Sequence, residues 1–335
     1  GGDSHYTTMQ GREKLRQAVA DRHARRTGEE LGPENVMICS GAQNALYFTA
    51  ACLVGQGDHV VVLEPAYVTY HATFSAAGAE VSYVAMPRES GFRLDAAALE
   101  AAIRPETKVI LFANPNNPTG VMLREDEVAA IAAIAERHDL WIVADEVYGD
   151  LVFEGSFVSM ASAPAARGRT VTISSLSKSH AMTGWRLGWL TGPRPLVEHC
   201  ERLNTAMLYG LPGFIQEGAY AALTLGDEVP DEMAAIYRQR RDVVLEGLRG
   251  INGLSCMRPQ AGMFMMVDVA GTGLDGQRFM EGLYEQTGVS VLAGGAFGPP
   301  SKDCVRVSFA ASEAQLAEGC KRIRAFVAGL NGAPA

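Results

Sequence analysis

Short apolar runs alternate with longer helical patterns from residue 35 to about residue 225. Five runs are continuous and rich in β-branched residues, and they cover residues 35–40, 59–64, 108–113, 140–145 and 170–175. Runs of this kind, separated by helical segments, are typical of strands buried on both faces of a mostly parallel sheet. The pattern therefore predicts a doubly wound α/β domain.

The pattern changes at a long amphipathic helix predicted over residues 230–250. Three strand-like runs (262–270, 288–294 and 304–310) and a terminal helix over 314–330 follow it. We interpret this part as a smaller C-terminal α+β domain. A length of 335 residues suits two domains. We place the large domain at residues 1–228 and the small domain at residues 229–335.

Charge and composition narrow the possible partners. The formal net charge is −9, which argues against nucleic acid or an anionic membrane as the main partner, since both require a basic face. The longest apolar stretches reach about half of the ~20 residues that a membrane-spanning helix needs. No signal peptide is visible, so we expect a cytoplasmic protein. The six scattered cysteines and seven histidines show no metal-ligand spacing, and we expect free, buried thiols and no metal site.

Uncommon polar side chains follow each of the five predicted strands. In strand order they are Ser40 to Gln43, then Glu64 and Tyr67, then Asn114 and Asn117, then Asp145 and Tyr148, and finally Ser175, Ser177 and Lys178. Ligands of open α/β sheets bind outside the carboxyl ends of the strands. We therefore expect these side chains to share one crevice.

Each of these residues also has a purely structural interpretation. Ser40 and Gly41 open a helix whose free N–H groups suit a phosphate, but an ordinary N-cap has the same sequence. Asp145 is a buried acid that needs a partner, or else the N-cap of the segment after it. Tyr67 can be a core residue, and residues 114–120 (NPNNPTG) can be a simple turn. Arg306 can lie on the solvent face of an edge strand.

Lys178 stands out among the lysines. The chain has 24 arginines but five lysines, and Lys14, Lys108, Lys302 and Lys321 lie in patterns typical of solvated positions. Lys178 instead lies among serines, eight residues before Arg186, an arginine between two tryptophans that we expect to be held. A phosphate site, a buried acid, an aromatic ring and an isolated lysine together suit pyridoxal 5′-phosphate, whose aldehyde forms a Schiff base with lysine.

Four motifs in this order resemble the class I/II aminotransferases of fold type I, the aspartate aminotransferase family. They are NPNNPTG (114–120), DEVYGD (145–150), SLSKSHAMTGWRLGW (175–189) and VRVSFA (305–310). The resemblance covers nearly the whole chain. It implies a transaminase that uses pyridoxal 5′-phosphate to move an amino group from an L-amino acid to a 2-oxo acid by a ping-pong mechanism.

The resemblance also implies a role for each residue. Lys178 would form the Schiff base and act as general base, Asp145 would pair with the pyridine nitrogen, and Tyr67 would stack on the ring. Tyr148 and Asn117 would bind the ring 3-oxygen, and Arg306, with Asn117 beside it, would bind the substrate carboxylate. The phosphate would be held by Gly41, Ala42, Gln43, Ser175 and Arg186. Tyr6 would reach the phosphate of a neighbouring subunit, which implies a homodimer with shared active sites.

Two departures from the family pattern affect these expectations. The family has a segment before the Tyr6 motif that closes over the substrate, and we expect poor turnover where that segment is missing. Ala293, in LAGGAFG, replaces a usual proline, which changes loop stiffness more than chemistry.

Substrate choice is less constrained. Within the family, the segments SLSKSHAMTGWR, MLYGLPGFIQ and GVSVLAGGAFGP are most similar to arginine–pyruvate transaminases. The alternatives are a β-eliminating C–S lyase on the same cofactor and a ligand-sensing aminotransferase-like domain. The chain shows no helix-turn-helix segment, which disfavours the sensor.

Overall fold

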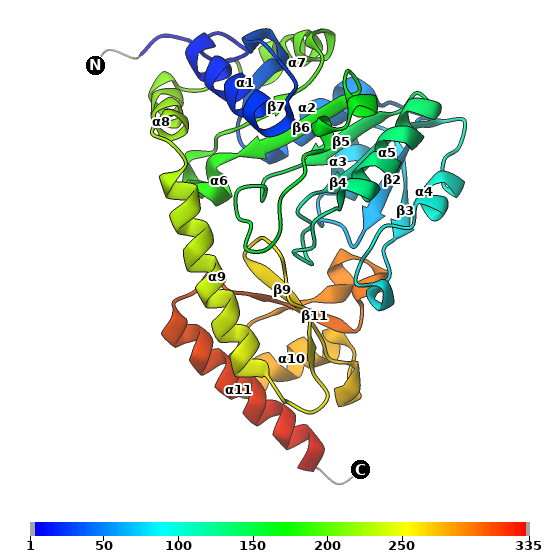
Figure 1. The fold of residues 1–335 in the computed structure, drawn as a ribbon, viewed down its shortest axis with the longest axis vertical. Helices are drawn as coiled ribbons and strands as arrows, with labels where there is room; N and C mark the ends of the chain where they lie inside the picture. Colours follow the sequence, from blue (N-terminus) through cyan, green and yellow to red (C-terminus); the bar gives the residue numbers. More distant parts are fainter. Residues whose placement is uncertain (1–3, 333–335) are drawn as a thin grey trace.

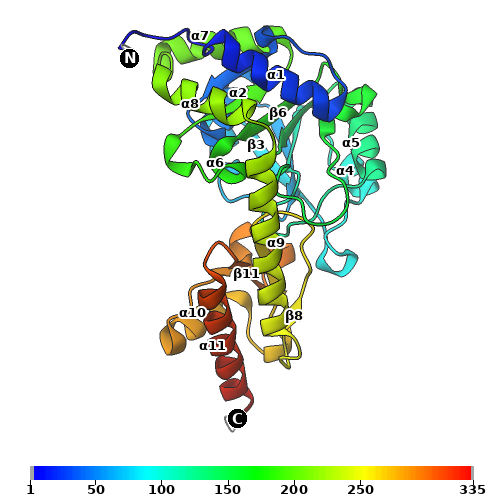
Figure 2. The ribbon, with the colours of Figure 1, turned by 60° about the vertical axis from the view of Figure 1, so that its left-hand side comes forward.

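The computed structural model describes residues 4–332 of the chain, with side chains described to residue 330. The molecule has a large part built on a seven-stranded sheet and a smaller part built on a four-stranded sheet (Figure 1). Helix α9 (Glu228–Leu248) begins beside the large part and runs down into the small one, and Figure 2 shows it crossing the narrow region between them. The predicted boundary at residues 228/229 falls at the start of this helix and stays a prediction.

The large sheet has the strand order β1-β7-β6-β5-β4-β2-β3. Its strands are β1 (Val36–Cys39), β2 (His59–Glu64), β3 (Glu80–Ala85), β4 (Thr107–Ala113), β5 (Trp141–Asp145), β6 (Thr170–Ser175) and β7 (Gly188–Thr191). The pairs from β3 through β6 are parallel, and β7 is antiparallel to both of its neighbours. The five strands expected from apolar runs are all present, and β2 and β6 are buried along their whole length.

Two strands of this sheet have no counterpart in the predicted set. The edge strand β3 carries exposed and half-buried side chains, among them Glu80 and Tyr83, so it lacks a continuous apolar run. Strand β7 is four residues long and lies in a segment whose sequence is dominated by the lysine motif. A short strand and an edge strand both escape a search for buried apolar runs.

Helices cover both faces of the large sheet, as the doubly wound prediction requires. They are α1 (Glu13–Thr27), α2 (Ala42–Leu53), α3 (Tyr70–Ala76), α4 (Ala96–Ala101), α5 (Glu125–Arg137), α7 (Arg194–Met207) and α8 (Gly213–Thr224). Phe48, Phe74 and Val197 of α2, α3 and α7 bury one face. Leu99 and Ile131 of α4 and α5 belong to a separate cluster on the other strand face. These two cores hold the strand ends in fixed positions.

The small part contains an antiparallel sheet in the order β10-β11-β9-β8. The strands are β8 (Ser255–Cys256), β9 (Phe264–Asp268), β10 (Leu292–Ala293) and β11 (Cys304–Ser308), and α9, α10 (Gly276–Thr287) and α11 (Glu313–Gly332) accompany them. The ring of Phe279 on α10 packs edge-on against Phe326 on α11 in its core. The α+β prediction is confirmed, although the strand expected over residues 288–294 is reduced to two residues.

The remaining expectations concern cysteines and the membrane. All six cysteines are free thiols: Cys39, Cys200, Cys304 and Cys320 are buried, whereas Cys52 and Cys256 are half-buried. Across the described residues, none of the helices has both the length and the apolar character needed to cross a bilayer.

Candidate active site

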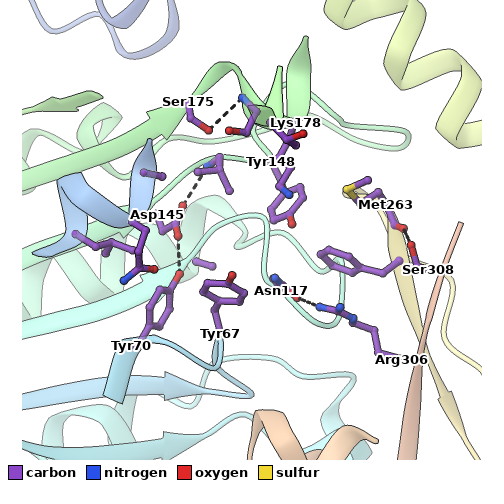
Figure 3. A pocket seen from close by; sticks show the side chains of 18 of the residues that line it. Tyr67, Tyr70, Asn117, Asp145, Tyr148, Ser175, Lys178, Met263, Arg306 and Ser308 are labelled. Carbon is purple, nitrogen blue, oxygen red and sulfur yellow. Dashed lines mark hydrogen bonds between the residues drawn. The ribbon is translucent and has the colours of Figure 1, made fainter. Parts of the chain in front are cut away.

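A cavity of about 370 Å³ lies where the carboxyl ends of β4, β5 and β6 face the small domain. Asn117 enters it from the loop after β4, Asp145 from the end of β5, and Lys178 from α6 (Leu176–Ser179), the single helical turn after β6. Arg306 enters from the opposite side, on β11 of the small domain (Figure 3). The structure thus brings together polar groups from distant parts of the sequence.

Most other predicted site residues line the same cavity. They are Ala42, Gln43, Tyr67, Tyr148, Ser175 and Arg186. Gly41 does not line the cavity itself but is the residue before the first turn of α2. Among the described residues, no group of three His, Cys, Asp or Glu side chains is arranged to hold a metal ion.

Asp145 is a buried carboxylate that faces the cavity with few partners. Its Oδ2 accepts a hydrogen bond from Tyr70 Oη (2.8 Å), and its Oδ1 accepts one from the backbone N–H of Val147 (3.2 Å). Burial raises the pKa of Asp145 to about 6, against the opposing effect of these two hydrogen bonds. The N-cap interpretation is wrong, because residues 147–150 form a turn and no helix. A cation in the cavity would relieve the cost of burying this charge.

Lys178 lies among small side chains that leave its chain room to move. Ser175 caps the helical turn, since its Oγ accepts a hydrogen bond from the N–H of Ser177 at 3.3 Å. Burial lowers the pKa of Lys178, and the nearby charge of Arg306 lowers it further. The other four lysines, all within the described part of the chain, are exposed and lie outside the cavity lining. An amine with a lowered pKa is suited to act as a nucleophile and as a base.

The start of α2 forms one end of the cavity. Gly41 has a φ of 85°, a conformation that favours glycine, and a Cβ on it would fall 2.5 Å from Nη2 of Arg186. A Cβ on Gly188 of β7 would fall 2.7 Å from the backbone nitrogen of Ala42. Arg186 and strand β7 therefore come close to the first N–H groups of α2 because positions 41 and 188 are both glycine.

Arg186 completes this end of the cavity. Its Nη1 donates a hydrogen bond to the carbonyl of Thr183 at 3.0 Å, and its Nη2 donates one to the carbonyl of Ser40 at 3.4 Å. The residue is held as expected, although it remains exposed at the cavity wall. A guanidinium, serine hydroxyls and the N-terminus of a twelve-residue helix form a site for a phosphate-sized anion.

Arg306 lies at the opposite end from this anion site. Its Nη1 donates a hydrogen bond to Oδ1 of Asn117 at 2.8 Å, and its buried Nε has no partner. The guanidinium also lies over the rings of Phe264 and Phe297, at 5.0 and 4.8 Å from the ring centroids. The edge-strand interpretation is wrong, because β11 has β10 on one side and β9 on the other. A half-buried guanidinium with unused donors fits a carboxylate.

Aromatic rings form the cavity wall between the two ends. The ring of Tyr67 packs edge-on against Tyr70, and the ring of Tyr148 packs edge-on against Phe264. Tyr148 is 5% exposed, and burial raises its pKa. Figure 3 shows Tyr67 and Tyr148 around the middle of the cavity, between Asp145 and Arg306.

Several lining residues were not predicted. Tyr70, Met263, Phe264 and Ser308 line the cavity, and Phe297 packs against Arg306. The available signal for Tyr70 was its place three residues after Tyr67, where the turn that follows β2 leads into α3 and the N–H of Tyr70 donates to the carbonyl of Tyr67 at 3.1 Å. The phenylalanines gave no signal, since an apolar residue in a strand pattern indicates only core.

Tyr6 does not line the cavity of its own chain. Its side chain is 85% exposed and its ring lies 5.4 Å from that of Tyr209. A role at the site of a second copy stays a prediction.

Comparisons with known proteins agree on one family. The family model described as aminotransferase class I and II matches residues 1–323. The arginine–pyruvate transaminase AruH of Pseudomonas aeruginosa is 46% identical over 331 residues, which cover 99% of this chain and 84% of that protein. The aspartate aminotransferase of Musicola paradisiaca is 36% identical, over an alignment that covers 92% of this chain and 78% of that protein.

Solved structures lead to the same family. The aspartate aminotransferase of Thermus thermophilus with maleate superposes with a TM-score of 0.92 at 32% identity, covering 97% of this chain and 84% of that chain. The aromatic aminotransferase of Pyrococcus horikoshii gives a TM-score of 0.95 at 29% identity, covering 98% and 88%. These relatives are named as transaminases, and none of them supports the lyase alternative.

Proposed function

Because this chain belongs to the class I and II aminotransferase family, we propose that it binds pyridoxal 5′-phosphate in the cavity between its domains and transfers amino groups there. The observation that carries the proposal is that four charged side chains line one cavity. Arg186 lines it beside the start of α2, Asp145 at the end of β5, Lys178 just after β6, and Arg306 on β11 of the small domain.

The residues present fit the cofactor at its phosphate end. The first N–H groups of α2, the hydroxyls of Ser175 and Ser177 and the guanidinium of Arg186 would hold the phosphate. The close approach of Gly41 and Gly188 leaves the helix N-terminus free of side chains on this side. This donor set matches the charge of a phosphate without requiring a metal.

The residues also fit the ring of the cofactor. Asp145 is a buried acid without a cationic partner at hydrogen-bond distance, and a protonated pyridine nitrogen would supply one. Tyr67 would stack on the ring, and Tyr148 and Asn117 would bind its 3-oxygen. When bound, the protonated ring supplies an electron sink that makes the proton on the substrate Cα acidic.

Lys178 would hold the cofactor through its Nζ and would then serve as the base. Its lowered pKa increases the fraction of neutral amine, which is the form that can accept the Cα proton. The hydroxyls and small side chains around it allow Nζ to move the proton over a short distance. Arg306 would bind the α-carboxylate that both the amino donor and the 2-oxo acid carry, and so would orient Cα toward Nζ.

Arginine and pyruvate are the first substrates to test. The support is the 46% identity to a protein named as an arginine–pyruvate transaminase. Asp145 is the one acidic side chain among the described residues that line the cavity. A substrate guanidinium would therefore be held by neutral oxygens and aromatic rings of this chain.

The test is a panel of L-amino acids with the purified protein and cofactor, using pyruvate or 2-oxoglutarate as acceptor. We expect alanine to form from pyruvate, fastest with arginine as donor. Alanine formation with other donors only would contradict the arginine assignment. Release of pyruvate and ammonia from cysteine-like donors without an acceptor, and no amino transfer, would contradict the transaminase proposal.

We also propose that the chain works as a homodimer. Exposed apolar side chains gather around the N-terminal segment and the turn between α7 and α8: Tyr6, Met207, Leu208, Tyr209 and Phe214. Large exposed apolar groups of this kind mark protein interfaces. Sedimentation should therefore give twice the chain mass of 35.8 kDa.

Tyr6→Phe provides a second measurement on the same proposal. If Tyr6 reaches the phosphate bound by the partner, the variant should remain dimeric while its cofactor affinity falls about tenfold to a hundredfold, as expected for the loss of one hydrogen bond to a charged group. A fully active monomer would contradict the shared site.

A further inference from the structure

The turn between β10 and β11 joins the two domains beside the cavity. It comprises the short helical segment Gly294–Phe297 (η7) and Gly298. The backbone carbonyl of Phe297 accepts a hydrogen bond at 2.9 Å from the N–H of Ala66, the residue before Tyr67. The turn belongs to the small domain by sequence, so this bond connects it directly to the wall of the cavity in the large domain.

The same turn is fixed on its own side by a buried serine. Ser301 is fully buried, and its Oγ lies 2.8 Å from the carbonyl oxygen of Gly294 and 3.1 Å from that of Gly298. A Cβ on Gly294 would fall 2.0 Å from the carbonyl oxygen of Ser301. The turn is therefore packed tightly onto the start of β11, the strand that carries Arg306.

Gly298 meets the large domain at a second point. It has a φ of 117°, and a Cβ there would fall 2.0 Å from Oε1 of Glu64, the last residue of β2. Glu64 is 8% exposed, so its carboxyl group has little room to retreat. A side chain at position 298 would therefore require the Glu64 carboxyl group, the turn or both to shift.

Phe297 connects this junction to the functional arginine. Its ring is 3% exposed and lies 4.8 Å from the guanidinium of Arg306. An arginine side chain has many rotamers, and fixing it costs up to about 2 kcal/mol of conformational entropy. The ring of Phe297 belongs to a turn that is bonded to both domains, so it limits the rotamers of Arg306 before any ligand binds. The ring also attracts the guanidinium cation.

We propose that Phe297 is a positioning residue for Arg306, and that the turn 294–298 sets the distance between Arg306 and the cavity wall at Tyr67. The inference rests on the proposed function, because it assigns the substrate carboxylate to Arg306. Every substrate of both half-reactions carries that carboxylate, so the effect of Phe297 is common to donor and acceptor. The phosphate site at α2 is built from other elements, so cofactor binding is independent of Phe297.

The test compares Phe297→Leu with Phe279→Leu. Both replace a buried phenylalanine of the small domain, but Phe297 packs against Arg306, whereas Phe279 packs on Phe326 in the core. Phe297→Leu should raise KM for both donor and acceptor by about twofold to thirtyfold, the range of a cation–π contact, with cofactor affinity unchanged. Phe279→Leu should lower the melting temperature and leave both KM values unchanged. Wild-type KM values in Phe297→Leu would overturn the proposal.

A glycine pair tests the turn without changing the aromatic ring. Gly298→Ala should reproduce the rise in both KM values, because its Cβ meets Glu64 and because a φ of 117° strains any residue with a side chain. Gly295→Ala, three residues earlier in the same turn, should behave as wild type, since its Cβ would have only the Cα of Lys302 within 4 Å, at 3.9 Å. Wild-type KM values in Gly298→Ala would contradict the role of the turn.

Pyruvate binding without an amino donor separates this inference from the proposed function. Its dissociation constant, followed by ligand-observed NMR in the presence of cofactor, should rise in Phe297→Leu by the same factor as KM. A wild type that binds pyruvate but transfers no amino group would contradict the proposed function, and the comparison of dissociation constants would still decide the role of Phe297. Equal pyruvate affinity in wild type and Phe297→Leu would overturn that role.

Discussion

Replacing Lys178 by alanine is expected to lower the rate of transamination by at least about a thousandfold. General-base transfer of a proton contributes about 10² to 10⁴ to a rate, and the variant loses in addition the amine that holds the cofactor. The other lysines are exposed and outside the cavity lining, so none can take over either task. Steady-state rates with saturating cofactor would measure this loss.

The same variant can be tested without measuring turnover. Borohydride treatment of the wild type with cofactor should leave a pyridoxyl group attached to the peptide that contains residue 178, as mass spectrometry would show. Lys178→Ala should carry no such group, whereas Lys321→Ala, a change at an exposed lysine of α11, should be labelled and active like the wild type. A labelled peptide elsewhere, or near-normal turnover in Lys178→Ala, would disprove the assignment.

Asp145→Asn is expected to lower turnover by about 10² to 10³ and, at the same time, to stabilise the protein without cofactor. The loss of activity follows because the neutral amide cannot hold a proton on the pyridine nitrogen, and one preorganised electrostatic group is commonly worth this factor. The gain in stability follows because the apo protein buries a carboxylate beside only two hydrogen-bond donors.

The raised pKa of Asp145 determines how the gain in stability depends on pH. The pKa of Asp145 is about 6 in the folded chain, against an ordinary value of 3.8, so the folded state holds this proton more tightly than the unfolded state. The contribution of Asp145 to stability is greatest below about pH 4 and is lost as pH rises through about 6. At pH 8 the free energy of unfolding of apo Asp145→Asn should exceed that of the wild type by about 1–3 kcal/mol, and the difference should vanish toward pH 4.

Asp150→Asn is the matched control for the stability measurement. Asp150 is also largely buried, but Arg22 and Arg26 pair with it and hold its pKa below the ordinary value. Its carboxylate therefore stabilises the fold at neutral pH, and the amide should destabilise it. Thermal unfolding of both variants at pH 8 should shift in opposite directions. Destabilisation of the apo protein by both substitutions would contradict the account of Asp145.

The polar half of the site could be predicted because its residues follow strands that the sequence marks clearly. Asn117, Asp145 and Lys178 each come after a buried apolar run, and parallel strands bring such positions to one edge of the sheet. The resemblance of the lysine motif to a known family then supplied chemical roles that strand position alone could not.

The apolar half of the site could not be predicted from the sequence. Phe264 and Phe297 look like ordinary core residues, and their proximity to Arg306 depends on how the small sheet packs. Arg306 and Asn117 are 189 positions apart, so their hydrogen bond depends on the docking of two domains and not on local pattern. The edge strand β3 was missed for a related reason, because one exposed face removes the apolar run.

Helix α9 is long enough to turn a small change of angle at its first turn into a larger displacement at its far end. At 21 residues it is about 31 Å long, since each residue of an α-helix adds about 1.5 Å. A tilt of about 5° about its first residue, Glu228, would carry the far end through roughly 3 Å, by the same rise per residue. A substrate bound between Arg306 on the small domain and the cavity wall of the large domain would oppose such a tilt, so part of its binding energy would hold the two domains at a fixed angle.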